Sequence, residues 1–202
     1  MSHDSPSHET VRQFTAKLEG RVNRTLKRGH TLPGDCISAD HYISATQGRL
    51  THTYGRERQG LTCGTLFVDH ASGKVFNFPQ HSTSASETVS NKHRLEKLAR
   101  EEGFNIKAYH TDNGTFALEE FKSDCTSQEQ SLSFSGVGAH HQNGVAERNI
   151  GTTTTWARAN LLHLAYHWPE FAAINLWPLA LDYAVWVFNR LPSLDTGLCP
   201  NE

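Results

Sequence analysis

Three carboxylates stand out because each lies where a predicted strand ends or a predicted helix begins. Asp40 closes the mostly apolar stretch "CISADHY", Asp112 follows a strand in "YHTDNGTF", and Glu147 comes just after the turn "HHQNG". In open α/β sheets, reactive side chains gather at strand ends and nearby loops, where they reach a crevice without disrupting the core. Carboxylate ligands with open coordination positions suit Mg²⁺ or Mn²⁺ rather than Zn²⁺. The sequence therefore predicts a divalent-metal site if the strands before Asp40 and Asp112 are neighbours.

Each acid also has a purely structural interpretation. An Asp before Asn-Gly is commonly a turn residue that bonds its own backbone, and the helix dipole alone favours a Glu in a first turn by about 0.3 to 1 kcal/mol. Asp40 is harder to explain, because an unpaired carboxylate in an apolar strand is costly unless it is solvated, paired or metal-bound. Asp35 and Asp69 compete for its role, but both adjoin predicted turns, and we interpret them as structural.

A mixed α/β sheet is the scaffold that would position these acids. Residues 1–33 form a polar, partly basic lead-in, residues 34–192 a single core domain, and residues 193–202 the start of a C-terminal linker. Three strands in succession, followed by alternating helices and strands, predict a five-stranded mixed sheet with helices on both faces. The predicted strands are 36–42, 61–68, 75–78, 104–109 and 131–135; the predicted helices are 84–100, capped by Ser84 and Glu87, 115–127, one carrying Glu147, and a buried one within 171–191.

Composition narrows the function classes. The net charge of -2 and the sequence pI of about 6.7 lack the basic balance usual in nucleic-acid binders, but residues 12–28 carry six basic side chains against Glu19 alone. This segment either meets phosphates or is a solvated arm. The four cysteines are too widely spaced for a zinc ribbon or a disulfide scaffold, and polar residues interrupt the apolar region 171–191, so no membrane contact is expected.

The ordered segments "SADHY", "FVDHASGKVF", "YHTDNGTF", "GVGAHHQNGVAERNI" and "LWPLALDYAVWVFNRLP" resemble the integrase catalytic core of copia-type long-terminal-repeat retrotransposons. Asp112 and Glu147 are 35 positions apart, which matches the separation that names the D,D-35-E integrases. The resemblance covers residues 34–202. It implies an RNase H-like fold, with Asp40, Asp112 and Glu147 as the catalytic, metal-binding triad. It also implies double-stranded DNA partners, a homo-oligomer, and action in the nucleus after a cytoplasmic particle stage.

The implied activity is that of a polynucleotidyl transferase. Two Mg²⁺ or Mn²⁺ ions can stabilise the attacking and leaving oxygens of an in-line displacement. We expect Asp40 to bridge the ions, with Asp112 and Glu147 each holding one of them. Water would then trim the element's DNA end, and the freed 3′-hydroxyl would attack a phosphate of the target DNA.

The residues around Glu147 are candidates to contact DNA. They are His141, Gln142, Asn143 and Arg148, by analogy with the equivalent loop in relatives. Asn143 could instead cap the helix, and Arg148 could be a solvated helix charge.

Two positions depart from the family pattern. Many relatives carry an Asn and a basic residue on the helix after the catalytic Glu, where this chain has Ile150 and Gly151. Gly151 and the run Thr152 to Thr155 also have low helix propensity, at a combined cost of about 2 to 3 kcal/mol relative to Ala. A domesticated or decayed DNA- or protein-binding module is therefore the alternative, and a related RNase H-like nuclease is a third. We expect the tryptophans beyond Leu161 to pack in the core rather than stack on bases.

Overall fold

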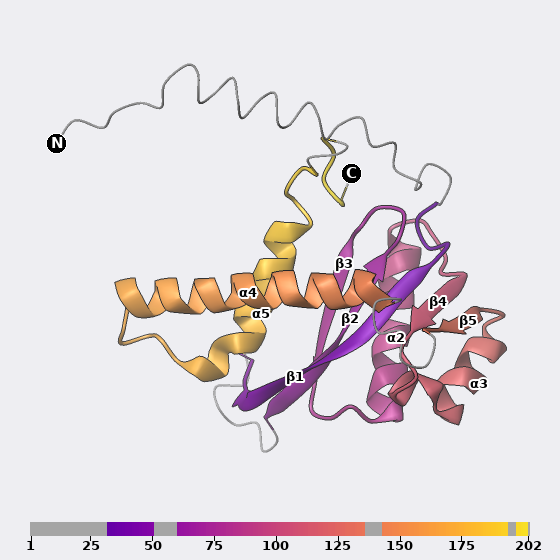
Figure 1. Ribbon diagram of the computed structural model, residues 1–202, viewed down its shortest axis with the longest axis horizontal. Helices are drawn as coiled ribbons and strands as arrows, with labels where there is room; N and C mark the ends of the chain where they lie inside the picture. Colours follow the sequence, from indigo (N-terminus) through magenta and orange to yellow (C-terminus); the bar gives the residue numbers. More distant parts are fainter. Residues whose placement is uncertain (1–31, 51–59, 136–142, 194–196, 202) are drawn as a thin grey trace.

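A computed structural model describes residues 32–50, 60–135, 143–193 and 197–201. Its centre is a five-stranded sheet in the order β3-β2-β1-β4-β5 (Figure 1). β1 pairs antiparallel with β2, which pairs antiparallel with β3, whereas β4 is parallel to both β1 and β5. The sheet is thus mixed, as predicted. The strands span Ile37–Gly48 (β1), Leu61–Asp69 (β2), Val75–Gln80 (β3), Ala108–Thr111 (β4) and Ser131–Phe134 (β5).

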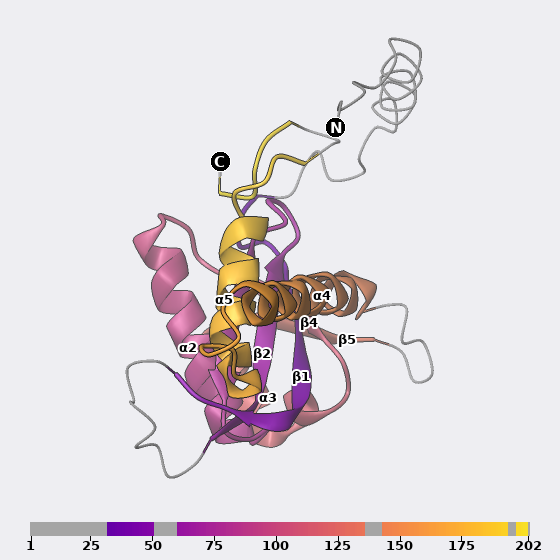
Figure 2. The same cartoon turned by 90° about the vertical axis from the view of Figure 1, so that its left-hand side faces the viewer.

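Helices cover both faces of this sheet, also as predicted (Figure 2). One core lies between the sheet and α2 and α3, and it contains Phe67 together with aliphatic and aromatic side chains from both layers. The other lies between the sheet and α4 and α5 and is built around Leu66, Val68 and Leu181. Because adjacent strand residues point to opposite faces, β2 supplies Phe67 to the first core and its two neighbours to the second. The helices span Ala85–Glu101 (α2), Glu119–Ser127 (α3), Gly144–His167 (α4) and Trp177–Phe188 (α5).

Leu95 of α2 and Phe121 of α3 are the helix side chains at the centre of the first core, and both are fully buried against the sheet. Phe116 and Cys125 are buried beside Phe121, which confirms the inner side predicted for the stretch 115–127. This stretch is not one helix, however. A single 3₁₀ turn at Thr115–Ala117 is followed by an extended residue, Leu118, and α3 begins only after it.

The helix α2 begins as its sequence predicts. Ser84 is the N-cap, and its hydroxyl accepts the backbone N–H of Glu87 at 3.4 Å. The Glu87 carboxylate does not return to Ser84 but accepts the N–H of Ser82 at 2.7 Å, so the predicted capping box is only half formed. Gly103, with a φ of +90°, ends the helix in the left-handed region that favours glycine.

All five strands differ from their predicted bounds, and two of them differ by more than two residues. β1 extends to Gly48 rather than ending at Tyr42, because β2 continues to pair with it as far as Leu61. The strand predicted at 104–109 begins only at Ala108, since the ladder between β1 and β4 starts at the pair Ile37–Tyr109. Lys107 instead donates its N–H to the carbonyl of Gly34 at 2.8 Å, in the turn before β1.

The apolar helix predicted within 171–191 was expected to be buried, and this expectation is wrong. α5 is amphipathic: Leu181 and Ala184 pack in the second core, whereas Tyr183 and Trp186 are about half exposed, at 54% and 53%. Over its 12 residues, α5 thus buries one side against the sheet and α4 and exposes the other, as a surface helix does. Within the described residues, no helix combines the length and apolarity that a membrane span requires.

Of the tryptophans expected to pack in the core, one packs against the sheet and two are half exposed. Trp177 donates its indole N–H to the carbonyl of Thr46 at 2.8 Å and packs edge-on against Tyr42, so it joins α5 to β1. Trp168 and Trp186 are half exposed and do not fill the core as expected.

Candidate active site

The sheet brings Asp40 and Asp112 together. β1 and β4 are parallel neighbours, and Ala39 is paired with Thr111 in their register. Asp40 and Asp112 are the next residues of the two segments, so both lie where the ladder between β1 and β4 ends. This is the adjacency on which the predicted metal site depended. Asp112 directly follows β4, whereas Asp40 lies inside β1 and not at its end as predicted, because β1 continues to Gly48. Asp112 also accepts the N–H of Gly114 at 3.2 Å, so the turn bond proposed as its structural role is present as well.

The first turn of α4 brings Glu147 to the same region. Alternation along β1 places Ile37 and Ala39 in the first core and Tyr42 in the second, so Asp40 faces the layer of α4 and α5. α4 crosses that face, and its first turn starts where β1 and β4 run side by side (Figure 1). Glu147 is exposed there, with Arg148 exposed beside it.

The charges of Asp112 and Glu147 both act on Asp40. Burial raises the pKa of Asp40 to about 6, and repulsion from the charges of Asp112 and Glu147 adds to this effect. The N–H of His41, which donates to Asp40 Oδ1 at 2.8 Å, opposes the rise by stabilising the charged form. None of the three acids forms an ion pair with a residue that the structure describes, so these residues leave their negative charges uncompensated.

The chemistry of the three acids suits a divalent cation, but their side chains lie too far apart in this structure to surround one. Their oxygen ligands and uncompensated charge suit Mg²⁺ or Mn²⁺. However, no group of three His, Cys, Asp or Glu side chains among the described residues is close enough to enclose a metal ion. Glu147 lies on the exposed surface of its helix turn, and its side chain would have to turn inward to join the two aspartates.

The two competing aspartates have structural roles, as expected. Asp69 is 1% exposed and accepts hydrogen bonds from the N–H of Gly34 at 2.8 Å and from the N–H and hydroxyl of Ser72. Asp35 accepts the N–H of Leu32 and pairs with Lys107 at 2.7 Å. Both carboxylates hold turns and are already satisfied.

His41 is a site neighbour that the sequence reasoning missed. Its ring stacks on Phe116 at 4.5 Å between centroids, and its Nε2 lies 3.0 Å from Thr88 Oγ1. Burial lowers the pKa of His41 to about 4, so the ring is neutral at physiological pH. The signal available in the sequence was strand alternation, which puts the residue after Asp40 on the opposite face of β1. There it packs against α2 and the turn after β4.

Of the four residues predicted to contact DNA, the structure describes Asn143 and Arg148. His141 and Gln142 lie outside the described residues, as does the basic stretch 12–28. Asn143 is described and is 1% exposed. Its side chain makes no capping hydrogen bond to α4, although it occupies the N-cap position, so the capping role is not realised. Instead its Nδ2 donates to the carbonyl of Ala39 at 3.2 Å.

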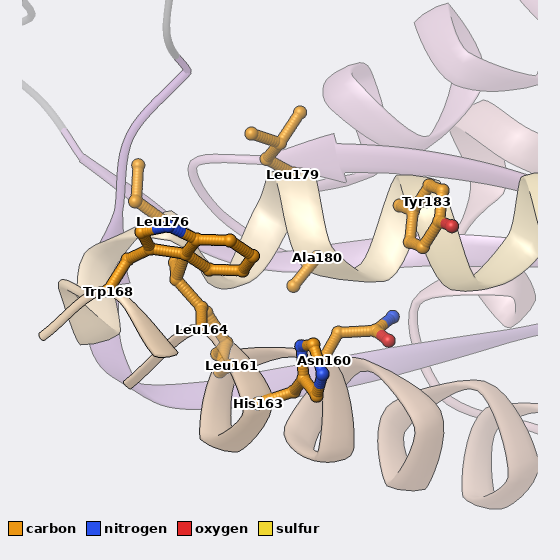
Figure 3. Close-up of a pocket in the computed structure, with 9 residues that line it drawn as sticks. All are labelled: Asn160, Leu161, His163, Leu164, Trp168, Leu176, Leu179, Ala180 and Tyr183. Carbon is orange, nitrogen blue, oxygen red and sulfur yellow. The ribbon is translucent and has the colours of Figure 1, made fainter. Parts of the chain in front are cut away.

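A separate apolar cavity of about 420 Å³ lies between the second half of α4 and α5 (Figure 3). Leu161, His163 and Leu164 of α4 face Ala180 and Tyr183 of α5 across it. No carboxylate lines this cavity, and it therefore does not belong to the acidic site.

Comparison with known proteins finds solved structures with a similar fold. The chain matches no family model and no curated protein sequence. Among solved structures it is similar to the HTLV-2 integrase catalytic core domain in complex with magnesium, in its trimeric form. That match has a TM-score of 0.59 and 22% identity over 84% of this chain and 95% of the other. The fold is that of an integrase catalytic core.

Two further integrase structures support this assignment. The BIV integrase catalytic core matches with a TM-score of 0.54 and 15% identity, over 83% of this chain and 91% of that one. A chain of the simian T-cell lymphotropic virus intasome matches with a TM-score of 0.58 and 21% identity; this chain spans 50% of its length. The mixed five-stranded sheet with flanking helices is thus the RNase H-like fold that was predicted.

Proposed function

We propose that this chain is the catalytic core of a copia-type retrotransposon integrase. The observation that carries the proposal is the meeting of Asp40 and Asp112 at one end of the parallel pair β1 and β4, within the electrostatic reach of Glu147. Such a group of uncompensated acids destabilises a folded protein unless it serves a ligand. The reaction is the processing of element DNA ends and their transfer into target DNA.

In this proposal the protein orients the reacting groups rather than forming a covalent intermediate. Asp40, Asp112 and Glu147 would hold Mg²⁺ or Mn²⁺, which when bound supplies charge stabilisation at the attacking and leaving oxygens. Asp40 is fixed by β1 and by its hydrogen bond from His41, and Asp112 by its turn with Gly114. Glu147 is the acid free to adjust, because it is exposed on α4.

The partners proposed are double-stranded DNA and further copies of the chain. The HTLV-2 core is known in dimeric and trimeric forms with magnesium, and the simian virus protein within an intasome. Arg148, exposed next to Glu147, is the described residue best placed for a phosphate contact. Action in the nucleus, after assembly in a cytoplasmic particle, completes the proposal.

A joining-reversal assay tests the chemistry. A branched DNA that mimics the strand-transfer product is incubated with the chain and Mn²⁺ or Mg²⁺, and resolution of the branch is measured. We expect metal-dependent resolution that is lost in Glu147→Gln and in Asp112→Asn, because each variant removes one ligand charge. Glu101→Gln, which changes an exposed acid at the end of α2, should retain full activity. Full activity in Asp112→Asn would sink the triad assignment.

A non-catalytic module with the same fold is the second candidate, and two observations favour it. The three acids do not enclose a metal position as they stand, and Ile150 packs against the second core where relatives carry an Asn. Calorimetric titration with Mn²⁺ separates the candidates. Absence of metal binding in a folded chain that also lacks activity would support the non-catalytic module.

A further inference from the structure

Asn143 links the strand that carries Asp40 to the helix that carries Glu147. Its Nδ2 donates to the backbone carbonyl of Ala39 at 3.2 Å, across 104 positions of sequence. Ala39 immediately precedes Asp40 on β1, and Glu147 lies four residues after Asn143, about one turn further along α4. A single hydrogen bond therefore joins the backbone next to one acid to the helix start that presents another.

The burial of Asn143 shows that this bond is not incidental. The side chain is 1% exposed, and its Oδ1 accepts no hydrogen bond from the described residues. A buried acceptor without a donor costs about 1 to 3 kcal/mol. A capping role would use Oδ1, yet no capping bond forms. The link to β1 is therefore the one hydrogen bond that this side chain makes with the described residues.

This link acts against a force described above. Like charges repel, and the first turn of α4 carries one of the three acids while β1 and the end of β4 carry the other two. The Asn143 bond pulls the same turn toward Ala39. Its position at the N-terminus of α4 is where such a restraint has most effect on the placement of Glu147.

We infer that Asn143 is a positioning residue that sets the distance between Glu147 and Asp40, rather than a residue that contacts DNA. The inference rests on the proposed function, since it assigns Asn143 a part in that same reaction. It predicts that loss of the amide donor weakens turnover and metal use while leaving DNA binding intact.

Steady-state kinetics of branch resolution test the inference. Asn143→Asp keeps the shape but replaces the donor with an acceptor facing the Ala39 carbonyl, and Asn143→Ala removes the side chain. We expect kcat to fall on the order of ten- to a hundred-fold, because misplacement by about 1 Å is sufficient for such a loss. The Mn²⁺ concentration for half-maximal activity should rise, with KM for DNA changed by less than about two-fold.

Asn149→Ala is the matched control. Asn149 also donates its amide to a carbonyl, that of Val145 at 2.9 Å, but this bond stays within α4 and does not reach the sheet. Its kcat and metal dependence should match those of the unchanged chain. A raised KM for DNA with unchanged kcat in Asn143→Ala would overturn the inference in favour of a DNA contact.

Hydrogen exchange keeps the inference testable apart from activity. In metal-free protein, Asn143→Ala should speed amide exchange at residues 148–150, whereas Asn149→Ala should not speed it to the same degree. If the unchanged chain proves inactive, the proposed function fails, but exchange still reports whether Asn143 holds the start of α4. Equal exchange in Asn143→Ala and the unchanged chain would overturn the positioning role.

Discussion

At the scale of single residues, Asp40 shows how a functional site costs stability. Its carboxylate is partly buried, faces two other acids and, among the described residues, accepts a single backbone N–H, that of His41. Because its pKa is raised from 3.8 to about 6, the folded state binds more protons than the unfolded state between these values. The contribution of Asp40 to the stability of the metal-free protein is therefore most favourable below about pH 4 and is lost as the pH rises through 6.

Asp40→Asn should for this reason stabilise the metal-free protein. The amide oxygen can still accept the His41 N–H, while the repulsion from Asp112 and Glu147 disappears. We expect a higher Tm than that of the unchanged chain at pH 8 in a chelator, and little difference at pH 4, by thermal melts followed with circular dichroism. Mg²⁺ should raise the Tm of the unchanged chain only. A lower Tm for Asp40→Asn at pH 8 would contradict this account.

The sequence predicts the three acids of the site but not the contacts that hold the segments around them in place. Asp40, Asp112 and Glu147 were predicted from strand ends, a helix start and a 35-residue spacing. The bond between Asn143 and Ala39 and the stack of His41 on Phe116 join segments far apart in the chain. No local pattern specifies such partners, because they depend on how the layers pack.

At the scale of elements, α4 forms despite its low intrinsic propensity. Each of the four threonines, Thr152 to Thr155, donates its hydroxyl to the carbonyl four residues earlier, at 2.6 to 3.0 Å. Thr153 is fully buried, and Ile150 and Trp156 pack against the second core. Tertiary packing thus outweighs the propensity cost, as the apolar positions of the sequence allowed.

Gly151→Ala isolates that propensity cost. Gly151 is exposed, and a Cβ built there meets no atom within 4 Å. The substitution should stabilise the protein by about 0.5 to 1 kcal/mol, since alanine loses less backbone entropy in a helix. Urea denaturation would show a higher midpoint at an unchanged m-value. A lower midpoint would mean that Gly151 has a contact or conformational role in the folded chain.

Element boundaries were predicted less well than element types. The strand at 104–109 was placed too early because its apolar residues, such as Ile106, serve the first core without joining the ladder. The apolar sequence of α5 suggested a buried helix, but hydrophobicity alone does not show which face lacks a covering layer. Strand register sets where the strand begins, and the absence of a further described layer over α5 leaves one side of that helix exposed.

At the scale of the whole molecule, the helices on one face are tied together by buried charges. Lys92 of α2 is fully buried and bonds Asp124 of α3 at 2.6 Å and Glu96 at 2.7 Å. Burial raises the pKa of Asp124, but hydrogen bonds from Lys92 and His93 outweigh it, and the net pKa is lowered. This group therefore stabilises the fold at neutral pH, and its contribution is lost as the pH falls below about 4, the usual range of an Asp.

Asp124→Asn should make the protein less stable at pH 7 and its stability less sensitive to acid. The neutral amide leaves Lys92 with one charged partner instead of two, and breaking a buried pair is costly. Urea midpoints measured from pH 3 to pH 7 would give both results. Glu101→Gln, which alters an exposed pair with Lys97 at 3.9 Å, should leave the profile unchanged. An Asp124→Asn profile as steep as that of the unchanged chain would contradict this role.

The bond between Asn189 and β3 has a consequence for how copies of the chain can associate. β3 is an edge strand, and Asn189, at the end of α5, accepts the N–H of Val75 at 2.9 Å and donates to its carbonyl at 2.7 Å. The side-chain amide thus occupies two of the backbone groups through which a foreign strand would extend the sheet. At Val75, this edge of the sheet is therefore closed to the addition of a foreign strand.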